Sequence, residues 1–236
     1  MQMLRPGLQL NEAFAALDQA DSALDARLDF AFHPQLGYLT ACPTNVGTGM
    51  RASAMLHLPG LVLSEQINPV IQAVNKIGHA VRGLYGEGTE AMGNLFQISN
   101  QVTLGEREED ILAELNKVIE RIIESESNAR QVLLQKNPEM LMDHVGRGFG
   151  ILSHAYAMSS KEALNLLSFL KLGVDLGFFP RERQEEIDAL FVLTQPAHLQ
   201  NDAHQEKLSP EQRDGLRAAT IRARLKNFPA PRHHQP

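Results

Sequence analysis

Two short segments of this sequence place arginines next to glycine-containing loops. Arg51 follows the polar run Cys42-Pro-Thr-Asn-Val-Gly-Thr-Gly49, and Arg82 begins the segment Arg82-Gly-Leu-Tyr-Gly-Glu87. The planar guanidinium of arginine holds phosphate oxygens through two parallel hydrogen bonds and stays charged at physiological pH. Glu87 adds a carboxylate and Cys42 adds the only thiol in the chain. These residue types would suit a site that holds a phosphate group beside a proton acceptor.

Each of these residues also has an ordinary structural interpretation. A single cysteine in a globular domain is usually a small buried apolar residue. Most arginines form surface ion pairs, and the glycines at 83, 86, 88 and 93 could simply mark a hairpin. Composition alone favours these interpretations, and the spacing of the two motifs favours the functional one.

A second candidate site lies near the carboxyl end, where Arg213 to Lys226 is basic within an acidic chain. If Arg213 to Ala218 is helical, Arg213 and Arg217 share one face and Asp214 projects about 100° away. Two guanidinium groups could then hold a phosphoryl group while the carboxylate meets a cation. The alternative is a solvated helix face, weakened by Gly215.

Composition restricts the classes of function. The formal net charge of −6 argues against binding to nucleic acid or to an anionic membrane over the whole surface. One cysteine, without a leader sequence or a long apolar segment, predicts a cytoplasmic protein that does not span a membrane. The nine histidines have no spacing typical of metal ligands, so we predict no metal site built by the protein.

The first part of the chain predicts a mixed α+β domain, with an antiparallel sheet flanked by helices, over residues 1–135. Apolar residues recur at helical spacing from Leu10 to Phe32, which predicts a helix with one buried face. The expected strands are Tyr38 to Ala41, Ala52 to Leu58, Val81 to Leu84 and Leu95 to Thr103, with a helix from Ile67 to Ala80 and a mobile segment from Tyr85 to Asn94.

A long amphipathic helix closes this part, and no strand pattern follows it. The helix is predicted over Glu106 to Leu134, with an apolar stripe formed by Ile111, Leu115, Val118 and Ile122, and by Leu112, Ile119 and Ile123 beside it. A boundary near residues 135 to 138 separates it from an all-helical domain over 136–236. Helices are expected there at Met140 to Met158, Lys161 to Leu170 and Arg183 to Leu193.

The motifs around Cys42, Arg51 and Arg82 resemble the carboxy-terminal catalytic half of the phosphagen (ATP:guanidino) kinases. Within that family, three segments look like the bacterial protein-arginine kinases, which phosphorylate arginine side chains in proteins. These segments are Arg82 to Asn100, Leu193-Thr-Gln-Pro196 and Arg213-Asp-Gly-Leu-Arg-Ala218. The resemblance extends from Met1 to about Leu225. It implies ATP as phosphoryl donor with Mg²⁺, and protein substrates that expose arginine.

The resemblance also assigns roles to residues. Glu87 occupies the family position of the carboxylate that orients the acceptor guanidinium and takes its proton, and Cys42 that of the reactive thiol beside it. The implied ATP contacts are Arg51, Ala52, Ser53, Ala54, Met55, Arg82, Gly83, Leu84, Tyr85, Gly86 and Glu87. The implied allosteric phosphoarginine pocket consists of Arg213, Asp214, Arg217 and Ala218.

Family members begin more than one hundred residues earlier, with segments that supply further arginines and a carboxylate. We therefore expect this chain to be a carboxy-terminal portion, weak or inactive as a kinase when alone. By resemblance the helical domain forms a homodimer. The alternative function is a non-catalytic dimerising module that reads phosphoarginine and recruits marked proteins to an AAA+ protease machinery.

Overall fold

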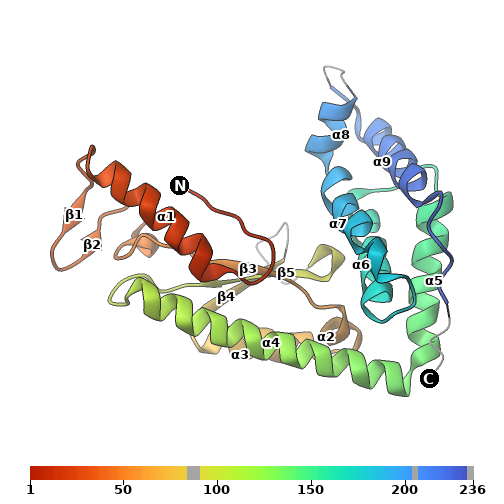
Figure 1. The fold of residues 1–236 in the computed structure, drawn as a ribbon, viewed down its shortest axis with the longest axis horizontal. Helices are drawn as coiled ribbons and strands as arrows, with labels where there is room; N and C mark the ends of the chain where they lie inside the picture. Colours follow the sequence, from red (N-terminus) through yellow and green to blue (C-terminus); the bar gives the residue numbers. More distant parts are fainter. Residues whose placement is uncertain (84–90, 204–206, 233–236) are drawn as a thin grey trace. The chain divides into compact units, whose positions relative to one another are not determined.

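The computed structural model describes residues 1–83, 91–203 and 207–232 (Figure 1). Its chain divides into two compact units. The first contains residues 1–56, 66–89 and 96–125, and the second contains residues 57–65, 90–95 and 126–236. Among the described residues, no helix is long and apolar enough to cross a membrane.

The first unit begins with helix α1 (Leu10–Asp25) and the short hairpin β1 (Phe32–His33) and β2 (Gly37–Tyr38). The predicted helix over Leu10 to Phe32 is therefore too long. Phe30 and Phe32 instead pack edge-on against the Tyr38 ring, and this aromatic contact replaces further helical turns. The predicted buried face is also wrong, because α1 has no buried residue. The predicted strand over Tyr38 to Ala41 is reduced to Gly37–Tyr38.

A three-stranded sheet in the order β3-β5-β4 supports the candidate site. Its strands are β3 (Ser53–His57), β4 (His79–Gly83) and β5 (Leu95–Asn100). Strand β4 pairs antiparallel with β5, so that Arg82 lies opposite Gln97 and His79 opposite Asn100. The predicted antiparallel sheet is thus confirmed.

Helices pack their apolar residues into the interior of this unit. Helix α3 (Ile67–Lys76) contributes buried Ile71 and Val74, and it ends earlier than predicted, before Gly78 at φ +83°. Helix α4 (Glu108–Lys136) follows the prediction closely, and six residues of its predicted stripe are buried. The seventh, Ile123, is 45% exposed because it lies on the solvent side of the helix.

The second unit is helical, as predicted. It contains α2 (Pro59–Leu63), the end of α4, α5 (Pro138–His154), α6 (Ser160–Asp175), α7 (Gln184–Leu193), α8 (Pro196–Asp202) and α9 (Pro210–Leu225). Short 3-10 turns occur in this unit at Met92–Asn94 and Arg181–Arg183, and in the first unit at Pro43–Asn45. Helices α5, α6, α7 and α9 share one apolar core that includes Val145, Leu167, Ile187 and Ile221. Helices α2 and α8 were not predicted because five and seven residues are too few to show a period.

Candidate active site

Arg51 and Arg82 line the same cavity in the first unit. The cavity has a volume of about 120 Å³, and its other lining residues are Thr44, Asn45, Met50, Asn100, Gln101 and Thr103. Arg51 lies just before β3, whereas Arg82 lies on β4, on the other side of the central strand β5. Two arginines that are 31 positions apart in the sequence therefore border one space.

Both arginines are exposed, and neither forms an ion pair with any described residue. Among the described residues, the interpretation of Arg51 and Arg82 as members of surface ion pairs therefore finds no support. A cavity bordered by two such cations attracts an anion, and guanidinium groups bind phosphate oxygens with favourable geometry.

Asn100 fixes the backbone on both sides of Arg51. Its side-chain oxygen accepts a hydrogen bond from the Ala52 N–H at 2.8 Å, and its side-chain nitrogen donates to the Met50 carbonyl at 3.2 Å. The same nitrogen donates to the Val102 carbonyl at 3.1 Å. Asn100 is only 5% exposed, so these bonds hold the backbone in place with little competition from water.

Thr103 plays a similar part for the loop that carries Cys42. Its hydroxyl lies 3.0 Å from the Thr44 carbonyl and 2.8 Å from the Val46 carbonyl, and its own carbonyl accepts from the Thr48 N–H at 3.0 Å. Gly47 makes this approach possible, because a Cβ there would lie 2.1 Å from the Thr103 oxygen. Neither Asn100 nor Thr103 was predicted at the site, since a single polar residue near the end of a strand has no distinctive pattern.

Cys42 is exposed, so it does not act as a small buried apolar residue. Its Sγ lies 3.0 Å from the Thr44 Oγ1. Hydrogen bonds from the side chain and the backbone of Thr44 lower the pKa of the Cys42 thiol below its usual value, and the charge of Arg51 acts in the same direction. This environment favours a thiolate near Arg51.

Some of the other residues predicted at this site lie outside the part of the chain that the structure describes. Leu84, Tyr85, Gly86 and Glu87 are not described, and most of the segment predicted to be mobile is also outside the described range. Gly83 is buried at the end of β4, Ala52 is buried before β3, and Ser53, Ala54 and Met55 belong to β3. No cluster of three or more potential metal ligands occurs among the described residues.

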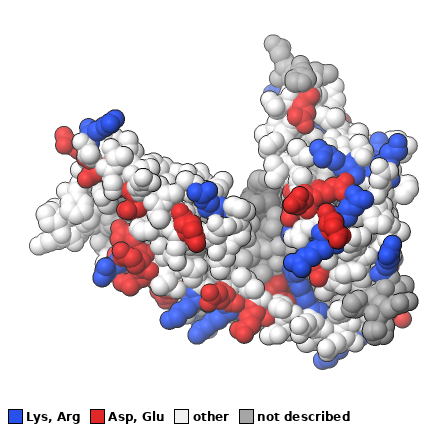
Figure 2. Space-filling view, viewed as in Figure 1, with Lys and Arg blue, Asp and Glu red and all other residues white. Residues whose placement is uncertain are grey.

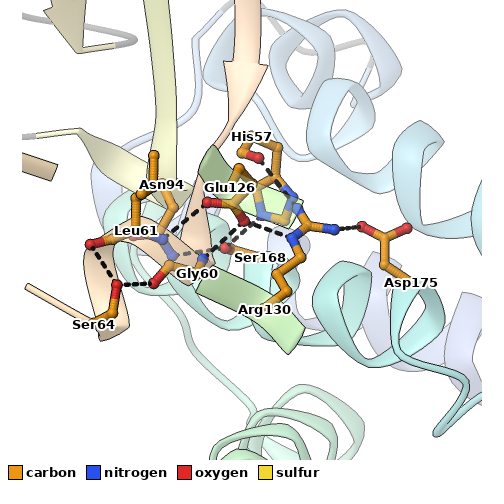
Figure 3. Close-up of polar contacts among 9 residues, drawn as sticks. All are labelled: His57, Gly60, Leu61, Ser64, Asn94, Glu126, Arg130, Ser168 and Asp175. Carbon is orange, nitrogen blue, oxygen red and sulfur yellow. Dashed lines mark hydrogen bonds and ion pairs between the residues drawn. The ribbon is translucent and has the colours of Figure 1, made fainter. Parts of the chain in front are cut away.

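Within the second unit, polar side chains of α6 contact His57 and the segment that contains Asn94 (Figure 3). The Ser168 hydroxyl on α6 lies 2.8 Å from the His57 Nε2, and it accepts a hydrogen bond from the Asn94 side chain at 2.8 Å. The Asn165 side chain accepts from the Gly93 N–H at 2.8 Å. Burial lowers the pKa of His57 well below its usual value, and the charges of Arg130 and Lys171 add to this effect.

The carboxylate of Glu126 caps the short helix α2. Its two oxygens accept from the Gly60 N–H at 2.8 Å and the Leu61 N–H at 2.9 Å, and the Arg130 Nε donates to the same carboxylate at 2.5 Å. Arg130 also donates to Asp175 at 2.7 Å and to the His57 carbonyl at 3.2 Å. This network connects α2, α4 and α6 within the second unit (Figure 3).

The predicted carboxy-terminal pocket lies at the start of α9, which begins with a capping box formed by Ser209 and Gln212. Arg217 is only 1% exposed. It donates to the Thr194 carbonyl at 2.9 Å, to the Met158 carbonyl at 2.7 Å and to Asp214 at 2.5 Å. Arg213 is half-buried and donates to the Leu208 carbonyl at 2.8 Å. In this conformation the two guanidinium groups make separate contacts.

Comparison with known proteins identifies the family. Residues 1–129 match the model of the ATP:guanido phosphotransferase, C-terminal catalytic domain. The chain belongs to the ATP:guanido phosphotransferase family. Residues 138–236 of this family member match the model of the protein-arginine kinase McsB C-terminal domain.

Relatives of this phosphotransferase family member include bacterial protein-arginine kinases. That of Geobacillus thermodenitrificans (strain NG80-2) is 50% identical over 226 residues, which are 96% of this chain and 62% of the relative. That of Halothermothrix orenii is 51% identical over 225 residues, covering 95% of this chain and 64% of the relative. The chain therefore spans less than two thirds of the length of these relatives.

Among solved structures, the duplicated taurocyamine kinase from Schistosoma mansoni with bound transition state analog components is 31% identical. The match covers 51% of this chain and 16% of that chain, with a TM-score of 0.45.

Proposed function

We propose that this chain is part of an ATP-dependent kinase that transfers a phosphoryl group to arginine side chains of proteins. The observation that supports the proposal is that Arg51 and Arg82 border one cavity without an ion pair to any described residue. The family match and the 50% identity to protein-arginine kinases supply the reaction class.

The two arginines would neutralise the phosphates of ATP. In phosphoryl transfer, negative charge spreads over the equatorial oxygens, and catalysis depends mainly on in-line positioning and fixed positive charge. Asn100 holds the backbone on either side of Arg51, so the starting point of the Arg51 side chain is fixed beside the cavity. Ala52, Ser53, Ala54 and Met55 would continue the ATP contact along β3, and Gly83 would do so at the end of β4. Mg²⁺ would be bound through the phosphates and would add positive charge between them.

The acceptor guanidinium must lose a proton before its nitrogen can attack the γ-phosphorus. Because its pKa is above about 12, a carboxylate must orient it and accept that proton. We assign this role to Glu87 from the sequence motif. Cys42 would lie beside the acceptor, where a thiolate stabilises the positive guanidinium electrostatically and forms no covalent bond. The lowered pKa of the Cys42 thiol supports this role.

We further propose that residues 1–135 form the catalytic domain and that residues 136–236 form a domain for homodimerisation and phosphoarginine binding. The match of residues 138–236 to the carboxy-terminal domain of protein-arginine kinases supports this division. Phosphoarginine would reach Arg213 and Asp214 at the start of α9. The other two predicted pocket residues, Arg217 and Ala218, are buried in this conformation, and Arg217 is bound to Asp214. From the sequence resemblance we also propose that marked proteins are passed to an AAA+ protease machinery.

Titration of the 236-residue chain with ATP tests the proposal. We expect Arg51→Gln and Arg82→Gln each to weaken ATP binding about tenfold to a hundredfold, as for loss of a charged hydrogen-bond partner. Arg121→Gln, at an exposed arginine on α4, is the matched control and should leave binding unchanged. Equal ATP affinity in all three variants would exclude this cavity as the nucleotide site.

A further inference from the structure

A second and larger cleft opens in the first unit, beside the β1–β2 hairpin. Its volume is about 240 Å³. Phe32, Leu36, Tyr38 and Leu104 are among the residues that line it. Phe32 is 58% exposed and Leu104 is 50% exposed, so these surfaces are accessible to a ligand.

The same cleft is acidic. Glu106 and Glu108 line it, and neither is paired with a lysine or arginine among the described residues. The neighbouring Arg107 pairs with Glu109, with 3.6 Å between the Arg107 Nε and the Glu109 Oε2. No lysine or arginine lines the cleft in the described part of the chain.

Further carboxylates on α1 extend the negative field over the cleft. Burial raises the pKa of the Tyr38 hydroxyl, and the negative charges of Asp21, Asp25, Glu108 and Asp18 raise it further. Figure 2 shows acidic side chains gathered in the part of the first unit formed by α1 and the start of α4.

Aromatic walls with carboxylates beside them are suited to one class of ligand. The side chains of arginine and lysine combine a long apolar stem with a cationic end. The stem can lie along Phe32 and Leu36, the cation is attracted by the face of an aromatic ring, and the carboxylates of Glu106 and Glu108 can pair with it. A phosphate or an acidic peptide would be repelled by the same groups.

This cleft adjoins the cavity of Arg51 and Arg82, because Thr103 lines both. The loop that carries Cys42 also borders both spaces, because Thr44 lines the first cavity and Thr48 lines the second. We propose that the cleft binds a basic side chain, arginine or lysine, of a polypeptide substrate whose target arginine enters the neighbouring site. The identity of the ligand as a substrate rests on the proposed function, whereas the binding of a basic side chain depends on the cleft alone.

A fluorescent peptide with two arginines separated by two glycines tests the cleft, with binding to the 236-residue chain followed by anisotropy. The neutral control peptide has citrulline, which has nearly the shape of arginine, at both positions. We expect the arginine peptide to bind more tightly at low salt than at high salt, because exposed charges are screened. We expect the double variant Glu106→Gln/Glu108→Gln to weaken its binding about threefold to tenfold.

Glu109→Gln is the matched control, because Glu109 belongs to the same first turn of α4 but does not line the cleft. It should retain wild-type peptide binding. Circular dichroism of the double variant reports whether the chain is still folded, and ATP titration reports whether the first cavity is intact. The proposal is overturned if the citrulline peptide binds as well as the arginine peptide, if the double variant keeps wild-type affinity, or if neither peptide binds. Loss of peptide binding in the double variant, in a chain that never binds ATP, would support the cleft while refuting the nucleotide site.

Discussion

Asn100 and Ala52 are joined by two hydrogen bonds that run in opposite directions. The Ala52 N–H donates to the Asn100 side-chain oxygen at 2.8 Å, and the Asn100 N–H donates to the Ala52 carbonyl at 3.2 Å. Ala52 directly follows Arg51, and both residues of the pair are buried. A buried amide thus holds the backbone on both sides of Arg51, from which its side chain starts.

Replacement of this amide should both destabilise the chain and weaken the site. We expect Asn100→Ala to lower the free energy of unfolding by about 1 to 3 kcal/mol, because the buried Ala52 N–H and Met50 carbonyl lose their partner. Urea unfolding followed by circular dichroism measures this loss. Gln101→Ala, at the exposed neighbouring position, should stay within about 0.5 kcal/mol of wild type. Unchanged stability of Asn100→Ala would contradict the role given to this amide.

The Glu126 carboxylate should be more costly to remove than other acidic residues of α4. It is 5% exposed and binds two backbone N–H groups and Arg130. We expect Glu126→Ala to cost about 2 to 4 kcal/mol of unfolding free energy, because the Gly60 and Leu61 N–H groups lose their acceptor and the half-buried Arg130 loses one of its partners. Glu124→Ala, at an exposed position on the same helix, is the control. Similar costs for the two substitutions would show that the network in Figure 3 contributes no stability.

The thiol of Cys42 should react at lower pH than an ordinary thiol. The lowered pKa means that the thiolate forms earlier as the pH rises, so the rate of alkylation by iodoacetamide should reach half its maximum at a lower pH. Because this is the only cysteine, the rate reports Cys42 alone. Thr44→Val removes the largest cause of the shift and should move the midpoint upward. Arg51→Gln should move it upward by less, because the Arg51 charge contributes less than Thr44 to the shift. A midpoint that is the same in Thr44→Val as in wild type would show that the hydrogen bond has no such effect.

The sequence predicted those features that have a period or a motif. The stripe of α4 was correct at six of its seven positions, and the motifs around Arg51 and Arg82 indicated residues that do border one cavity. The predicted burial of α1 failed because periodicity shows that a helix has an apolar side and does not show whether anything packs on it.

The residues that hold the site in place were harder to find. Asn100 and Thr103 act through backbone groups about 50 to 60 positions away in the sequence, which no local pattern encodes. The burial of Arg217 has the same origin, because its carbonyl partners at Met158 and Thr194 come from other segments of the chain.

A double-substitution cycle on ATP affinity tests the central claim most directly. If Arg51 and Arg82 hold one triphosphate, the effect of Arg51→Gln should change by at least about 0.5 kcal/mol when Arg82→Gln is already present. Adenosine, which has no phosphate, should show no effect of either substitution. Strictly additive effects on ATP, or equal effects on ATP and adenosine, would mean that the two arginines do not share a phosphate chain.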